Sequence, residues 1–166
     1  MCNVPLPSDQ KAQVYVLVLG NQLLRTATTP EVFLSGTVHG NERVGPTAVV
    51  EFASALLEMY SSSAWARRLV DTRTIVIVPA ANSLGYDANV REENGIDPNR
   101  DFAWDQAASS CMATVAARTI NELFRRHAFQ LGLTFHAGDR SPPPPLAASC
   151  IADTLQGWRS SQACHW

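Results

Sequence analysis

The stretch RTIVIVPA at residues 73–80 decides the fold, because it is apolar at nearly every position. An alternating pattern would indicate a strand with one wet face, whereas a continuous β-branched run predicts a strand that is buried on both faces. Strands of this kind occur in sheets that are covered by helices on both sides. The stretch therefore predicts the centre of an α/β domain.

The segments around this run predict the rest of that domain. Further strands are predicted from short β-branched runs at residues 13–19, 31–39 and 130–136. Helices are predicted where apolar residues recur every three or four positions, at residues 46–57 and 112–124. The polar stretch 82–108 is expected to be a loop. Strands that alternate with helices are typical of an α/β fold with a mixed, largely parallel sheet flanked by helices.

The length of 166 residues suits one domain with a real core. The sequence divides into a short N-terminal segment at 1–12, a folded domain at 13–141 and a divergent tail at 142–166. The tail opens on SPPPP, which favours neither helix nor strand, and its later residues show no period. We expect the tail to be disordered.

Charge and composition exclude several classes of partner. A formal net charge of -2 gives no reason to expect binding to nucleic acid or to an anionic membrane. No apolar stretch approaches the roughly 18 residues of a membrane span, and the start MCNVPLPSDQ lacks the features of a signal peptide. A cytoplasmic location is therefore expected, and the oligomeric state is left open. No CxxC pair is present, and free thiols are expected at Cys2, Cys111, Cys150 and Cys164.

Three candidate metal ligands, His39, Glu42 and His136, follow two of the predicted strands. His39 and Glu42 lie in HGNERVG, after the strand at 31–39, and His136 ends the strand at 130–136. Two imidazoles and one carboxylate form a zinc site with an open fourth position, which is the catalytic form of zinc coordination. Two plainer interpretations are an exposed His and Glu in an ordinary loop, and a satisfied core histidine at the strand end.

The spacing of His39 and Glu42 requires a turn. On a straight strand, residues three apart point to opposite faces. Glycines at positions 36, 40 and 45 are expected to let the backbone turn sharply. Such a turn would bring both side chains to one ion.

The segment VREENGIDPNRDF at 90–102 contains the candidate substrate-binding residues. Asn99 and Arg100 place an amide beside a guanidinium, and Arg91 adds a second cation. Arginine binds carboxylates through paired donors, so these residues suit a carboxylate ligand. The alternative is a solvated loop in which the arginines form salt bridges with Glu92, Glu93, Asp97 and Asp101.

Four segments together resemble the zinc carboxypeptidases of the M14 type. They are HGNERVG, NSLGY, GIDPNRDF and TFHAG, which occur in the same order as in that family within residues 13–141. The resemblance implies a partial zinc-carboxypeptidase-like fold, one Zn²⁺ ion and removal of C-terminal residues from peptides. The implied substrate is a peptide or a small molecule with a C-terminal carboxylate.

The resemblance also implies a role for each matching residue. His39, Glu42 and His136 would be the zinc ligands. Asn99 and Arg100 would hold the terminal carboxylate of the substrate, and Arg91 would stabilise the developing oxyanion. Asp101 is a candidate for orienting a zinc ligand or Arg100 from the second layer of residues.

The sequence departs from the family pattern after His136. The family's general base is a glutamate downstream of the third zinc ligand, with a tyrosine between them. This chain has no glutamate after Glu122 and no tyrosine after Tyr86, and Asp139 and Asp153 are the carboxylate side chains after His136. The general base is therefore expected to be missing, the chain to be truncated at both ends, and its activity to be weak or absent. A frameshift, an alternative exon or a wrong gene model from about Pro142 would explain the tail, and a genuinely divergent tail is the alternative.

Two other functions are compatible with parts of this pattern. A zinc deacylase of the aspartoacylase or succinylglutamate desuccinylase type resembles the chain in HGNE and in an Asn-Arg pair. NSLGY and PNRDF favour the peptidase instead. A non-catalytic zinc-binding or peptide-binding remnant is the third interpretation, and the missing glutamate favours it.

Overall fold

The computed structural model describes residues 13–102 and 112–137. The predicted N-terminal segment and the predicted tail lie outside these residues, as do the four cysteines and Asp139. The part that is described contains all six residues predicted to form the site.

The described strands form one four-stranded sheet. They are β1 (Leu17–Leu19), β2 (Glu31–Ser35), β3 (Thr74–Val78) and β4 (Phe129–Thr134), in the spatial order β1-β3-β2-β4. β2 pairs in parallel with both β3 and β4, whereas β1 pairs with β3 in the antiparallel direction. Every residue of β3 is buried, as its unbroken apolar sequence predicts. The predicted mixed, largely parallel sheet is confirmed.

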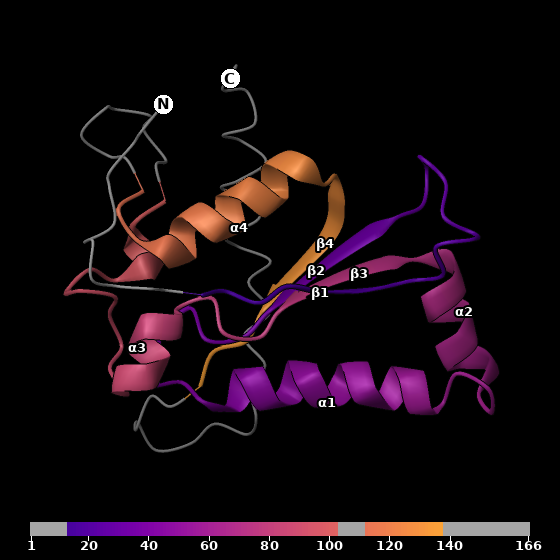
Figure 1. The fold of residues 1–166 in the computed structure, drawn as a ribbon, viewed down its shortest axis with the longest axis horizontal. Helices are drawn as coiled ribbons and strands as arrows, with labels where there is room; N and C mark the ends of the chain where they lie inside the picture. The colour runs from indigo at the N-terminus through magenta and orange to yellow at the C-terminus, as the bar shows by residue number, and fades with distance from the viewer. Residues whose placement is uncertain (1–12, 103–111, 138–166) are drawn as a thin grey trace.

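Helices cover both faces of this sheet (Figure 1). The described helices are α1 (Val44–Glu58), α2 (Ala64–Thr72), α3 (Ser83–Ala88), the 3-10 turn η1 (Pro98–Arg100) and α4 (Val115–Arg126). α1 lies on one face and α4 on the other, and α3 lies near the end of the sheet at which α1 begins. None of the described helices has the length and apolar character needed to cross a membrane.

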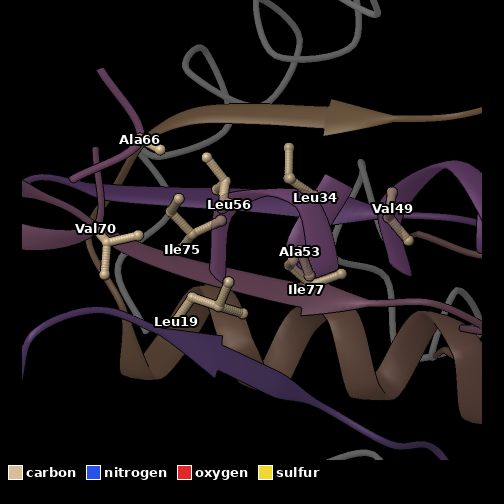
Figure 2. Close-up of a cluster of buried hydrophobic side chains, with 9 residues drawn as sticks. All are labelled: Leu19, Leu34, Val49, Ala53, Leu56, Ala66, Val70, Ile75 and Ile77. Carbon is tan, nitrogen blue, oxygen red and sulfur yellow. The ribbon is translucent and has the colours of Figure 1, made fainter. Parts of the chain in front are cut away.

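Two apolar clusters join the helices to the sheet. Figure 2 shows the first cluster, in which α1 and α2 pack on the sheet through Leu19, Leu34, Val49, Ala53, Leu56, Ala66, Val70, Ile75 and Ile77. The second cluster holds α4 on the opposite face through Phe33, Val38, Val78, Ala81, Ala116 and Ile120. Leu34 and Phe33 are neighbours in β2 and belong to different clusters, because successive strand residues point to opposite faces.

Several predicted boundaries differ from the structure. The predicted strands at 13–19 and 31–39 are shorter, since the ladders cover only Leu17–Leu19 and Glu31–Ser35. α2 was not predicted; only Ala66 and Val70 of its nine residues are buried. α3 was not predicted either, because it has six residues, with a glycine among them, inside the polar stretch 82–108.

The register of the parallel strands places their carboxyl ends side by side. Ser35 of β2 is paired with Val78 of β3 on one side and with Thr134 of β4 on the other. The Ser35 hydroxyl donates to Oγ1 of Thr134 at 3.0 Å, and the Phe135 N–H donates to the Ser35 carbonyl at 2.8 Å. Loops that follow these strands therefore start from one edge, which is where ligand sites form in sheets of this type.

Candidate metal centre

A tight turn after β2 brings the first two candidate ligands together. Thr37 is buried and has a φ of 46°, a left-handed conformation that is costly for a β-branched residue. The Glu42 N–H then donates to the His39 carbonyl at 3.1 Å. Nδ1 of His39 consequently lies 2.7 Å from Oε1 of Glu42, and the predicted turn between the two residues is present.

His136 reaches the same point from β4, two residues after the strand ends at Thr134. Its Nδ1 lies 2.8 Å from Oε2 of Glu42 and 3.2 Å from Nδ1 of His39. The Ala137 N–H donates to Oε2 of Glu42 at 3.0 Å and holds that carboxylate in place. The structure thus brings together the three residues that the sequence predicted as ligands.

The distances among the two Nδ1 atoms and the two oxygens of the Glu42 carboxylate suit one small cation. Zinc bonds of about 2.0–2.1 Å in a tetrahedral arrangement put neighbouring ligand atoms about 3.3 Å apart. The observed separations are 2.7 Å from Nδ1 of His39 to Oε1 of Glu42, 2.8 Å from Nδ1 of His136 to Oε2 of Glu42, and 3.2 Å between the two Nδ1 atoms. His39, Glu42 and His136 are the group of His, Cys, Asp and Glu side chains in the described residues that could hold a metal.

The hydrogen bonds of His39 also favour a cation between these groups. Its Nε2 lies 3.1 Å from Oδ1 of Asp97, which can only accept when ionised, so Nε2 carries a proton. In a neutral imidazole, Nδ1 then carries no proton. Its lone pair faces the Glu42 carboxylate and Nδ1 of His136. Two acceptors at 2.7 Å repel each other unless a proton or a metal ion lies between them. One metal ion satisfies all three donors at once, whereas without a metal an additional proton would be needed between Nδ1 of His39 and Glu42.

Asp97 supports His39 from outside the ligand set. Burial raises the pKa of Asp97, but the Asn99 backbone N–H, the Arg91 guanidinium and His39 together lower it by more, so the net shift is downward. Asp97 is therefore an anion across the neutral pH range. The carboxylate beside the outer nitrogen of a ligand histidine fixes the tautomer and the direction of the ring. From the sequence, Asp97 was predicted only as a salt-bridge partner of an arginine, and its contact with His39 was not foreseen.

Arg91 lies beside the predicted ligands. Its NH2 is 3.0 Å from Oδ2 of Asp97, and its NH1 is 3.4 Å from Oε1 of Glu42. The side chain is 44% exposed, so one side of the guanidinium is open to solvent. The salt bridge between Arg91 and Asp97 that the plainer interpretation predicted is present, and it lies at the candidate metal centre rather than away from it.

Asn99 and Arg100 form the short turn η1, directly after Asp97. The Asn99 N–H donates to Oδ1 of Asp97 at 2.9 Å, the same oxygen that faces His39. Arg100 is exposed, and its NH1 donates to the Asn99 carbonyl at 3.1 Å. The backbone of this turn is thus linked to a candidate ligand by two hydrogen bonds that share Oδ1 of Asp97.

Asp101 has other partners than the two suggested by the sequence. Its carboxylate accepts from the N–H groups of Ala113 and Thr114 and from the Thr114 hydroxyl, at 2.7–3.0 Å. Glu93 likewise binds backbone N–H groups at the start of α4 instead of an arginine. These carboxylates therefore stabilise the start of a helix, which has unpaired N–H groups.

The glycines near the site serve close packing rather than sharp turning. None of Gly36, Gly40 and Gly45 has a left-handed φ, contrary to the reason given for them from the sequence. A Cβ on Gly40 would overlap the backbone of Gly85 and Val90, and one on Gly36 would lie 2.5 Å from the Pro79 carbonyl oxygen. Gly40 thus lets the ligand turn lie directly against α3.

Comparisons with known proteins agree with this geometry. The sequence profile of the peptidase M14 family, zinc carboxypeptidase, matches residues 7–142. Carboxypeptidase E of Caenorhabditis elegans is 32% identical over 89 residues, which cover 45% of this chain and 19% of that protein. Probable carboxypeptidase 2 of Arthroderma benhamiae is 31% identical over 115 residues, which cover 63% of this chain and 20% of that protein. The chain spans about a fifth of the length of these curated relatives.

Solved structures share the fold. A metallo-carboxypeptidase from Burkholderia cenocepacia matches with a TM-score of 0.63 at 20% identity, over 76% of this chain and 33% of that chain. Thrombin activatable fibrinolysis inhibitor matches with a TM-score of 0.64 at 16% identity, over 88% of this chain and 44% of that chain. The described fold is thus similar to part of each of these two structures. With the family profile matching most of its length, this chain belongs to the zinc carboxypeptidase family.

Proposed function

We propose that this chain is the zinc-binding portion of a carboxypeptidase, with His39, Glu42 and His136 as ligands of one Zn²⁺ ion. The observation that carries the proposal is the convergence of two Nδ1 atoms and one carboxylate within 3.2 Å of each other. With Glu42 and Asp97 ionised, no assignment of protons to a neutral pair of imidazoles satisfies all three groups. A metal ion does, and the relatives that match this chain are named carboxypeptidases.

Bound zinc would act as a Lewis acid on a carbonyl and would lower the pKa of a water in its open position. The residues of the chain would bind and orient the substrate around it. Arg91 is 3.4 Å from Glu42, so its exposed guanidinium lies beside the proposed ligands. A cation at this place suits the negative charge that develops on the oxygen of the scissile carbonyl.

Asn99 and Arg100 are proposed to bind the terminal carboxylate of the peptide. Both belong to η1. The Asp97 carboxylate caps the start of this turn by accepting from the Asn99 N–H. Arg100 is exposed and holds its guanidinium beside the Asn99 carbonyl at 3.1 Å, so it is free to pair with an incoming carboxylate. The result would be a site that binds the end of a peptide and rejects an internal segment.

Peptide binding tests this proposal without relying on turnover. In the presence of zinc, a peptide with a free C-terminal carboxylate should bind at least about tenfold more tightly than the same peptide with an amidated end, since hydrogen bonds to charged groups contribute about 1.5–3 kcal/mol. Arg100→Ala should remove this preference. Arg68→Ala, which changes an exposed arginine on α2, should retain it. Equal binding of both peptides to the wild-type chain would contradict a carboxypeptidase.

A further inference from the structure

Glu93 is a buried carboxylate whose position the metal centre does not by itself explain. Its residue is 2% exposed, and its two oxygens accept from the Val115 N–H at 2.6 Å and the Ala116 N–H at 3.0 Å. These are the first two residues of α4, and the Thr114 hydroxyl accepts from the next free N–H, that of Ala117. The start of a 12-residue helix is thus bound by a side chain that comes from a distant loop.

That loop is a tight hairpin. Glu93 and Ile96 exchange backbone hydrogen bonds of 2.9 and 3.0 Å, and the two residues between them, Asn94 and Gly95, have φ values of 52° and 79°. Two consecutive positive φ values are typical of a type I′ turn, for which Asn-Gly is the preferred sequence. The hairpin brings Arg91, which precedes it, against Asp97, which follows it, at 3.0 Å.

Both elements that Glu93 joins lead to a proposed zinc ligand. On the hairpin side, Asp97 lies 3.1 Å from Nε2 of His39. On the helix side, α4 ends at Arg126 and β4 begins shortly afterwards, at Phe129. His136 lies two residues after the end of β4 at Thr134. Glu93 therefore connects the support of one histidine to the helix that precedes the other.

We propose that Glu93 is a positioning residue for the metal centre, which holds the hairpin that carries Arg91 and Asp97 at a fixed distance from α4. The inference rests on the proposed zinc site. The positive end of the helix and two N–H donors favour a carboxylate at this buried point. A side chain with one acceptor oxygen cannot accept from both N–H groups with separate atoms, so the hairpin would lose its fixed place relative to the helix.

The test is the affinity of the whole 166-residue chain for Zn²⁺, measured by competition with a chromophoric chelator. Glu93→Gln keeps the size of the side chain but replaces one acceptor with an NH₂ donor that faces a backbone N–H. We expect the affinity to fall about tenfold, the low end of the range for groups that touch a ligand directly. The matched control is Glu31→Gln, since Glu31 also accepts from a backbone N–H, that of Ala128 at 2.8 Å, at the opposite ends of β2 and β4.

The control separates positioning from general loss of stability. Glu31→Gln should destabilise the fold and leave the zinc affinity within about twofold of wild type, because it lies at the other edge of the sheet. If Glu93→Gln binds zinc as tightly as wild type, the positioning role is wrong while the zinc site stands. If the wild-type chain binds no zinc, the proposed metal centre is overturned, and the role of Glu93 with it.

A second measurement uses only the wild-type chain, so it tests the inference even if the Glu93→Gln variant does not fold. If Glu93 couples the helix start to the metal, zinc must in turn stabilise the bonds that Glu93 makes, because coupling between two sites is reciprocal. Zinc should therefore slow hydrogen exchange at the N–H groups of Val115 and Ala116 more than at that of Ala128. Equal slowing at all three amides would overturn the inference.

Discussion

Asp97 and His39 meet at the outer nitrogen of the imidazole, where Oδ1 of the carboxylate lies 3.1 Å from Nε2. The inner nitrogen, Nδ1, faces Glu42 at 2.7 Å. One side of the ring therefore carries a proton toward an anion, and the other side presents a lone pair to the shared centre. The same oxygen of Asp97 accepts from the Asn99 N–H, so the proposed ligand His39 and the proposed substrate turn have a common support.

Replacing Asp97 with asparagine should weaken zinc binding about 10–100-fold, the usual effect of losing a partner of a ligand histidine. The neutral amide neither holds the imidazole proton as strongly nor keeps Arg91 in place. Zinc affinity measured by chelator competition checks this. Asp71→Asn removes another hydrogen-bonded carboxylate, which binds Asn21 and Tyr60, and should leave the affinity unchanged. Equal effects of the two variants would contradict the role of Asp97.

The described histidines make a direct test of the ligand set. His136→Ala should remove stoichiometric zinc binding, because two ligands from a single turn would remain. His127→Ala changes a histidine that pairs with Glu31 at 3.0 Å, and the chain should still bind one zinc ion. Metal content after gel filtration distinguishes the two outcomes. Retention of one zinc ion by the His136 variant would rule it out as a ligand.

Gly40→Ala should destabilise the fold by about 3 kcal/mol or more, because the new Cβ overlaps backbone atoms that cannot move aside singly. Gly95→Ala is the comparison, since its Cβ would meet nothing within 4 Å and only the φ of 79° opposes it. That variant should cost about 1–2 kcal/mol. Urea unfolding of both proteins gives the two values, and a Gly40 variant as stable as the Gly95 variant would refute the close contact with α3.

Glu31 should make the stability depend on pH in acid. Burial raises its pKa, but His127, the Ala128 N–H and Arg25 lower it by more, so it lies below the ordinary value of 4.5 in the folded chain. A lowered pKa stabilises the folded state above pH 4.5, and this stabilisation is lost as the pH falls through the folded value. The stability difference between wild type and Glu31→Gln should thus be about 2 kcal/mol near pH 7 and shrink below pH 4.5.

A comparison variant shows whether this loss belongs to Glu31. Glu51→Gln changes an exposed glutamate on α1 and should differ little from wild type at any pH. Urea unfolding at several pH values measures both differences. A difference for Glu31→Gln that stays constant from neutral pH to well below 4.5 would contradict the expected titration.

Peptide hydrolysis by a polypeptide of these 166 residues should be slow. A positioned general acid or base contributes roughly 10²–10⁴-fold, and no glutamate follows Glu122 in the sequence. Any residual turnover should vanish with a chelator and return with zinc. Turnover by the purified chain at the rate of a homologous carboxypeptidase would show that another group transfers the proton.

The strands and the convergence of the candidate ligands were predictable because their signals are local. β3 is recognisable from its unbroken apolar sequence, and the site follows from His39, Glu42 and His136 at the ends of two predicted strands. Parallel pairing alone places such ends at one edge, so the convergence did not require knowledge of the packing.

The remaining features depend on contacts between distant segments. Nothing in the sequence separates Asp97, which faces His39, from Glu93 and Asp101, which bind the start of α4. All three are acidic residues of one loop, and the position of α4 in the folded chain determines which partner each one has. The requirement for glycine at position 40 was equally hidden. A side chain there would overlap the backbone of Gly85, which lies in α3, a helix that was not predicted.

The separation of the proposed ligands along the chain has a consequence for the order of folding. His39 and Glu42 are three residues apart, whereas His136 is 97 residues from His39. Bringing together two residues that far apart in the sequence is slow, because the chain between them loses conformational entropy before the stabilising contacts form. We therefore expect the local pair to meet a metal ion early, and the third proposed ligand to arrive only after β4 has added beside β2. Two kinetic phases of zinc capture, a weak fast one and a slow tightening one, would report the docking of that strand.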